Sequence, residues 1–204
     1  MQSNTTPKQE RKKNTFVSLV ITFIFILIIT SSCDEDYTPR PRGYFRLTLP
    51  VKSYKEFKSA CDFSFKHPTY TIINIDHDYN AEACWYNLDF PLFHARLHIS
   101  YKPVENNLSR LLEDSYTLAM KHSAKADAIN QNIIYYPDRN VFGIKYNING
   151  NAASMVQFVL TDSIDNFFRG ALYFNHPPNK DSIAPVLEFI DQDIDSLIKS
   201  FKWK

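Results

Sequence analysis

Two histidines are the first residues whose type and spacing suggest chemistry. His94 and His98 fall on one face of a predicted strand, and imidazole nitrogens are common metal ligands. At about 3.3 Å per residue the two positions lie about 13 Å apart, too far for one ion with bonds of about 2 Å. We therefore interpret the pair as part of a solvated sheet face and predict no metal site there.

The segment D-H-D-Y-N at 76–80 offers a second metal hypothesis. Asp76 and Asp78 carry the oxygen ligands that calcium prefers, and His67 and His77 could approach them. The segment lacks the glycine turn and the distal acid of an EF-hand loop. A polar loop is therefore the favoured interpretation, and we expect no metal.

The familiar catalytic motifs do not occur in the sequence. It contains no G-x-S-x-G elbow, no C-x-x-C pair and no phosphate-binding glycine motif, and it has only 4 glycines. Asp191, Asp193 and Asp195 are two residues apart, so on a helix they point in different directions, and we interpret them as its solvent-facing side. We expect no enzyme and no cofactor, with a triad assembled from distant residues as the open alternative.

The first 33 residues have the order of an export signal. Three basic residues at 11–13 precede an apolar run from Phe16 to Ile29. As a helix this run would rise about 21 Å, short of the roughly 30 Å hydrocarbon core of a bilayer, which disfavours a spanning anchor. The string I-I-T-S-S-C that follows resembles the lipobox of bacterial lipoproteins, although Thr30 stands where an aliphatic residue is usual. The resemblance implies that Cys33 becomes the lipidated first residue; a soluble export signal and an uncleaved anchor are the alternatives.

The cysteine and charge counts agree with an exported protein. With Cys33 acylated, Cys61 and Cys84 remain as an even pair, and disulfides persist in oxidising compartments. We predict that these two pair, with two free buried thiols as the alternative. Removing residues 1–32 leaves 19 basic and 21 acidic residues. Without a basic excess, nucleic acid is not expected as a partner.

The composition divides the chain into three segments. Residues 1–32 form the predicted lipoprotein signal peptide. Residues 33–43 are rich in acids and prolines, which favours an extended tether. Residues 44–204 have the length of one domain, and the 44% hydrophobic content of the chain is typical of a folded globular protein.

Alternating apolar and polar residues predict strands in much of this domain. The clearest runs are 44–49, 93–102, 142–148 and 156–160, and 63–65 and 71–75 are shorter candidates. The run 167–174 has apolar residues at both parities, which predicts a central strand in a sheet covered on both faces. Asn149-Gly150 predicts a hairpin turn.

Two amphipathic helices are predicted from apolar residues spaced by three and four. One follows Asn106-Asn107 and runs to about Ile129, and the other runs from about Asp181 to Phe201 with Pro185 in its first turn. Hairpins imply an antiparallel sheet, and the helices need its faces for burial, so we predict one α+β domain. The run from the last hairpins to D-x-x-I-x-S-F-K resembles the Mog1/PsbP-like arrangement.

Several long strings give a wider resemblance. The sequence resembles the gliding-motility lipoprotein GldD family over essentially all of the chain after Cys33. The strings that carry it are S-C-D-E-D-Y-T-P-R-P-R-G-Y-F-R-L at 32–47, C-W-Y-N-L-D-F at 84–90, L-H-I-S-Y-K-P at 97–103, G-N-A-A-S-M-V-Q-F at 150–158 and R-G-A-L-Y-F-N-H-P-P-N-K-D-S-I-A-P-V at 169–186.

The resemblance implies a lipid-anchored envelope protein required for gliding motility and linked to type IX secretion. We expect a non-enzymatic assembly or stabilising factor whose partners are the membrane, other gliding and secretion lipoproteins, and envelope proteins. The family supplies no catalytic residues; only Cys33 transfers by position, with Cys61 and Cys84 as a structural pair. The alternatives are an envelope hydrolase acting on glycan or peptidoglycan and a small-ligand-binding lipoprotein. We favour the outer membrane, facing the periplasm, over the periplasmic face of the cytoplasmic membrane.

Overall fold

The computed structural model describes residues 18–23, 48–175 and 180–204. Contacts divide the chain into two units, Met1–Phe45 and Arg46–Lys204. In the first unit the described residues 18–23 are helical, and the Thr22 hydroxyl donates a hydrogen bond to the Ser18 carbonyl at 2.8 Å. The predicted lipidation site Cys33 and the tether lie outside the described residues. Among the residues that the structure describes, no helix has the length and hydropathy needed to cross a membrane.

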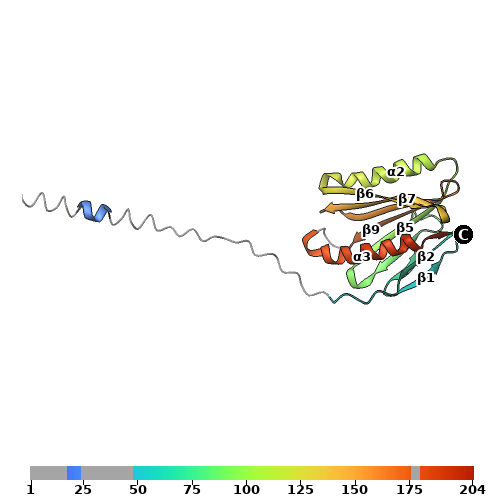
Figure 1. Ribbon diagram of the computed structural model, residues 1–204, viewed down its shortest axis with the longest axis horizontal. Coiled ribbons are helices and arrows are strands. Elements are labelled where there is room, and N and C mark those ends of the chain that lie inside the picture. The colour runs from blue at the N-terminus through green and yellow to red at the C-terminus, as the bar shows by residue number, and fades with distance from the viewer. Residues whose placement is uncertain (1–17, 24–47, 176–179) are drawn as a thin grey trace, which may run out of the picture. The chain divides into compact units, whose positions relative to one another are not determined.

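The second unit contains a seven-stranded sheet in which every neighbouring pair is antiparallel (Figure 1). The strand predicted to be central, β9, has three strands on each side and is mostly buried, which confirms that prediction. The order across the sheet is β3 (Ile72–Ile75), β4 (Tyr86–Phe90), β5 (Ala95–Pro103), β9 (Asn166–Phe174), β8 (Ser154–Thr161), β7 (Val141–Gly150) and β6 (Ala126–Tyr136).

A second, three-stranded sheet was only partly predicted. Its strands are β1 (Tyr54–Lys58), β2 (Phe63–Pro68) and β10 (Lys202–Trp203), with β2 in the middle. Only β2 matches a predicted strand. The strand predicted at 44–49 lies mostly outside the described residues, and positions 48–50 are not in a strand.

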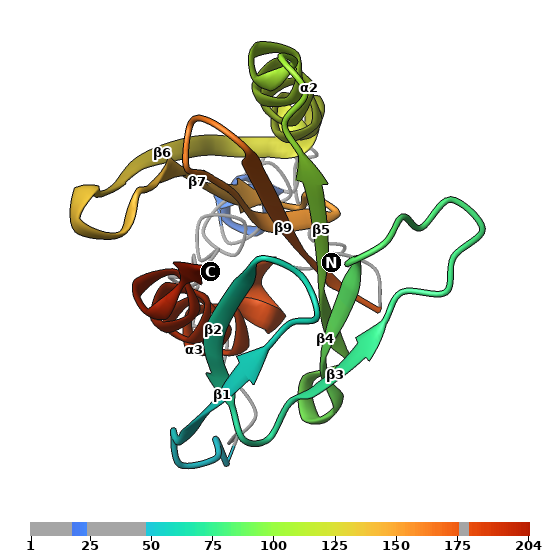
Figure 2. The same ribbon diagram turned by 90° about the vertical axis from the view of Figure 1, so that its right-hand side faces the viewer.

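The core lies between the large sheet and a layer formed by α3 (Lys180–Ser200) and the small sheet. Figure 2 shows these elements on one side of the large sheet and α2 (Leu108–Met120) on the other. Three aromatic rings join the layers. The ring centroid of Phe168 in β9 lies 5.1 Å from that of Phe63 in β2 and 4.9 Å from that of Phe201, which follows α3. A smaller cluster joins Ala119 of α2 to Tyr146 of β7. This arrangement confirms the predicted α+β class with an antiparallel sheet and two packed helices.

The first predicted helix is too long, whereas the second has the predicted bounds to within one residue. The first helix ends at Met120 rather than near Ile129; residues Lys121–Lys125 form the short 3-10 helix η2, and β6 starts at Ala126. β-Branched and aromatic residues in β6, such as Ile133 and Tyr135, favour the strand. In the second helix Pro185 lies at the sixth position, beyond the first turn. Two further 3-10 helices, η1 (Pro91–Phe93) and η3 (Pro137–Arg139), precede β5 and β7.

The hairpin predicted at Asn149-Gly150 exists, but its turn lies further along. Both residues belong to β7 and pair with β6, and the chain turns over residues 151–153 before β8. Gly150 has φ +122°, and a Cβ there would lie 2.7 Å from the Lys125 carbonyl oxygen. The glycine is therefore needed for its backbone conformation and its close approach to Lys125.

Candidate interaction surface

The strand β6 forms one edge of the large sheet. Among the described strands it pairs only with β7, from Ala126 opposite Gly150 to Tyr136 opposite Val141. Edge strands are usually shortened or protected by charges and prolines. β6 is 11 residues long, and residues 128–136 contain no charge and no proline. Its outer backbone edge is therefore suited to pairing with another strand.

Two apolar side chains on one face of β6 are exposed. Ile133 is 84% exposed and Tyr135 is 66% exposed. They lie opposite Ile144 and Phe142 of β7, and the Tyr135 and Phe142 ring centroids are 5.5 Å apart. Ile144 packs against Ala119 and its neighbours, so this is the face on which α2 lies. The edge thus carries an apolar surface next to α2.

The opposite face of β6 borders a groove next to α3. The groove has a volume of about 310 Å³, and its lining includes Ile134, Tyr136, Lys145, Ile198 and Lys199. Side chains alternate between the two faces of a strand. An extended segment paired with β6 would therefore place alternate side chains over this groove. Backbone pairing together with side-chain recesses is the arrangement used in recognition by strand addition.

Two acids of α3 are partly exposed, as predicted, but they also form ion pairs that the prediction missed. Asp191 and Asp195 lie one turn apart, and both bind the Lys145 ammonium of β7 at Nζ–Oδ1 distances of 2.7 and 2.6 Å. The Lys145 side chain is 7% exposed. The two carboxylates offset the cost of burying its charge. The spacing of four residues, which puts both acids on one helix face, was the signal for this pair.

The third acid, Asp193, is the most buried of the three at 1% exposed. Its carboxylate accepts hydrogen bonds from Lys52 at 3.0 Å, from the Tyr54 hydroxyl at 2.8 Å and from the Tyr70 hydroxyl. Burial and the Asp193 carboxylate raise the pKa of Tyr70 and of Tyr54 above the ordinary tyrosine value, so both remain donors. The contacts link α3 to β1 and to the turn after β2.

The two histidines of the first metal hypothesis lie in different elements of the structure. His94 is not in a strand: it ends η1 with a left-handed backbone, φ 48°, and β5 starts one residue later. His98 is exposed and lies edge-on to Tyr173, with ring centroids 5.5 Å apart. Arg96 is also exposed and donates to Asp89 at 2.5 Å. Both histidines line a cavity of about 460 Å³ on this face.

The second metal hypothesis combined residues that the structure places in different settings. His67 is buried in β2 with its Nδ1 2.8 Å from the Thr71 hydroxyl, and burial, together with the charge of Lys55, lowers its pKa to about 4. Asp76 accepts a hydrogen bond from the Asp78 backbone N–H at 3.1 Å within a loop. Over 18–23, 48–175 and 180–204, no three His, Cys, Asp or Glu side chains gather in a way that could hold a metal.

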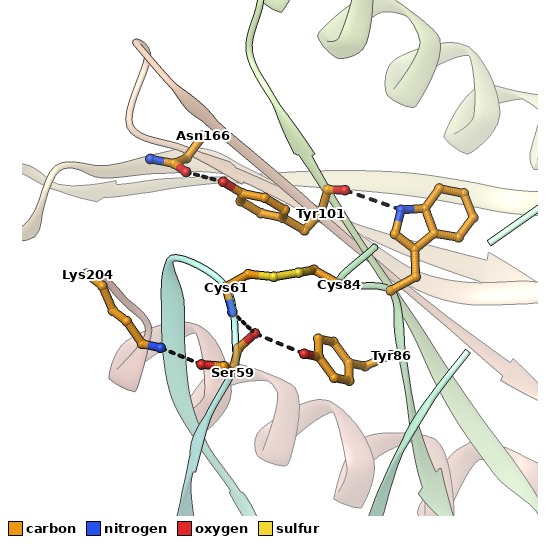
Figure 3. The surroundings of a disulfide bond; sticks show 8 residues. Ser59, Cys61, Cys84, Tyr86, Tyr101, Asn166 and Lys204 are labelled. Carbon is orange, nitrogen blue, oxygen red and sulfur yellow. Dashed lines mark hydrogen bonds between the residues drawn. A yellow bond between two sulfur atoms is a disulfide. The ribbon is translucent and has the colours of Figure 1, made fainter. Parts of the chain in front are cut away.

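Cys61 and Cys84 form a disulfide between the two sheets (Figure 3). Cys61 lies between β1 and β2, Cys84 lies just before β4, and their Cα atoms are 6.2 Å apart. The Ser59 hydroxyl accepts the Cys61 N–H at 2.9 Å and lies 3.1 Å from the Tyr86 hydroxyl. The surroundings of the bond are therefore ordered by hydrogen bonds from both sheets.

Comparison with known proteins identifies the family of this chain. No curated protein matches the sequence significantly. The chain is similar to the solved solution structure of cyanobacterial PsbP (CyanoP) from Synechocystis sp. PCC 6803, at 12% identity and a TM-score of 0.49, over 78% of this chain and 98% of that one. The family described as gliding motility lipoprotein GldD matches residues 34–203. Because this match covers most of the sequence, the chain belongs to the GldD family of gliding motility lipoproteins, as the sequence strings predicted.

Proposed function

We propose that this protein is a non-enzymatic assembly or stabilising factor of the gliding and type IX secretion apparatus, and that it acts by binding other envelope proteins. The observation that supports this role is the β6 edge. It is long, uncharged over residues 128–136 and flanked by the exposed side chains of Ile133 and Tyr135. Such an edge is a hazard for a free protein and an advantage for one that pairs with a partner.

We propose that the partner contributes an extended segment that pairs with β6. Alternate side chains of that segment would enter the groove beside Ile198 of α3, and the others would cover Ile133 and Tyr135. Other gliding and secretion lipoproteins and envelope proteins are the proposed source of this segment. No catalytic step is assigned to the chain.

We propose that a lipid on Cys33 holds the protein at the membrane. Cleavage would remove residues 1–32, residues 33–43 would form the tether, and residues 44–204 would form the domain. The family match begins at residue 34, directly after the proposed attachment site. The proposed location is the outer membrane, facing the periplasm, and separation of the two membranes by density tests it against the periplasmic face of the cytoplasmic membrane.

The test is crosslinking and immunoprecipitation of the untagged lipoprotein from membranes of a gliding bacterium. A variant carrying Ile133→Lys and Tyr135→Lys adds two charges to the β6 edge at exposed positions. We expect it to fold, to bind its partners about tenfold or more weakly, which corresponds to about 1.4 kcal/mol of binding free energy, and to fail to restore spreading to a deletion strain. Ile164→Lys, at an exposed isoleucine in the β8–β9 turn, is the matched control and should behave as wild type.

Unchanged recovery of partners by the β6 variant would contradict binding through this edge. Normal spreading and secretion in a clean deletion strain would contradict the role in the apparatus. Cys33→Ala tests the anchor separately, because it should release the protein from the membrane fraction without changing the domain.

A further inference from the structure

A small crevice lies on the face of the large sheet that carries α2, beside the loop after β3. Its volume is about 210 Å³. Two strands of the sheet, β5 and β9, and the loop contribute its lining, which includes Asp76, Asp78, Trp85, His98, Ser100 and Arg169. This size is below that of pockets for drug-sized ligands, so it suits a smaller molecule.

Arg169 supplies a positive charge without a carboxylate partner. It lies in the central strand β9 opposite Ser100 of β5, and its Nη2 donates to the Gln157 Oε1 at 2.6 Å. Within the described part of the chain, no carboxylate oxygen lies within 4.0 Å of its guanidinium nitrogens. Gln157 is itself buried, and its Nε2 has no hydrogen-bond acceptor there. A part-buried charge held this way is costly until an anion pairs with it.

The charge of Arg169 helps to lower the pKa values of two nearby histidines. Burial lowers the pKa of the Arg169 guanidinium, which remains protonated. Burial, Arg96 and Arg169 lower the pKa of His98, and burial and Arg169 lower the pKa of His122. Both imidazoles are therefore neutral at pH 7, and Arg169 is the cation that the crevice presents from the sheet.

The loop side of the same crevice is acidic. Asp76 and Asp78 line it, and both carry backbone hydrogen bonds that fix the loop: Asp76 accepts from Asp78, and Asp78 accepts from Tyr79 at 2.7 Å. These acids disfavour a ligand with several negative charges, because like charges repel. They favour a ligand with a positive group at the opposite end from its anion.

We propose that this crevice binds a zwitterion of amino-acid size, with its carboxylate on Arg169 and its ammonium group facing Asp76 and Asp78. The guanidinium offers paired donors that match a carboxylate. Ser100, opposite Arg169, adds a hydroxyl, and the Trp85 indole forms part of the wall. This site is independent of the β6 edge and of the proposed role in the apparatus.

The test is titration calorimetry of the full chain in detergent with three probes. L-Alanine carries both charges, N-acetyl-L-alanine carries only the carboxylate, and L-alanine methyl ester carries only the ammonium group. We expect L-alanine to bind, N-acetyl-L-alanine to bind about fivefold more weakly, and the ester to bind at least about tenfold more weakly. Absence of L-alanine binding up to about 10 mM would overturn the proposal.

Two variants test which side chains bind the carboxylate and the ammonium group of the ligand. Arg169→Gln should weaken L-alanine binding at least about tenfold, whereas Arg96→Gln, the matched control whose guanidinium pairs with Asp89 on the same face, should change it less than about twofold. Combining Asp76→Asn with Asp78→Asn alters only loop residues, so the test survives even if Arg169→Gln does not fold. This double variant should bind L-alanine more weakly and N-acetyl-L-alanine more tightly. Equal affinities in wild type and double variant would overturn the proposal.

Discussion

His67 couples the stability of the domain to pH through a single side chain. It is 4% exposed, and its pKa is lowered to about 4 in the fold, against about 6.5 in an unfolded chain. As the pH falls from about 6.5, the unfolded chain takes up a proton that the folded chain does not. We expect a loss of about 3 kcal/mol in unfolding free energy by pH 4, levelling off below it, measured by urea titration at several pH values.

The control for this residue is a second histidine. His67→Gln should remove this part of the pH dependence, whatever it does to the stability at pH 7. His77→Gln changes an exposed histidine in a loop and should leave the slope as in wild type. An identical slope in the His67 variant would show that other groups cause the acid sensitivity.

At the scale of elements, Asp193 holds α3 against β1. Asp193→Ala would leave Lys52, Tyr54 and Tyr70 without their common acceptor. Because the part-buried hydroxyls of Tyr54 and Tyr70 would lose their acceptor, we expect the unfolding free energy to fall by about 3 kcal/mol in urea titrations. Glu188→Ala, at an exposed position of the same helix, should change it by less than about 0.5 kcal/mol. Equal effects of the two changes would show that the Asp193 contacts do not stabilise the packing of α3 against β1.

Local periodicity predicted the elements whose burial is regular. The alternation along β5 correctly separated the buried Leu97 and Ile99 from the exposed Arg96 and His98. The mixed pattern of 167–174 correctly placed β9 at the centre of its sheet. In both strands each face keeps much the same burial along most of its length. The order of apolar and polar residues in the sequence therefore shows which faces are buried.

The failures arise where distant contacts decide the structure. Asp193 lies on the apolar stripe of α3, and only the positions of Lys52 and Tyr70 explain a carboxylate there. The two residues of β10 are too few to show a period. β6 takes its edge position from a sheet order that joins β5 to β9 across the sequence. The candidate interaction surface therefore needed the structure, whereas the family could be predicted from long sequence strings.

For the whole molecule, the disulfide fixes one sheet relative to the other. Cys61 and Cys84 are 23 residues apart, and closing a loop of that length stabilises the fold by about 3 kcal/mol in the chain-entropy model. Combining Cys61→Ser with Cys84→Ser should lower the unfolding free energy by about this amount. Wild-type protein kept in reductant should match the double variant. Equal stability of oxidised wild type and double variant would show that the bond contributes nothing.

The pairing of β10 with β2 sets an order in time for folding. Lys202 and Trp203 lie opposite Ser64 and Phe63, and the Lys204 backbone N–H donates to the Asp62 carbonyl at 3.0 Å. The small sheet therefore cannot close until residue 203 has been synthesised. Contacts so distant in sequence form slowly. Until then β2 lacks one of its two neighbouring strands, and the Phe63 ring lacks its contact with Phe201.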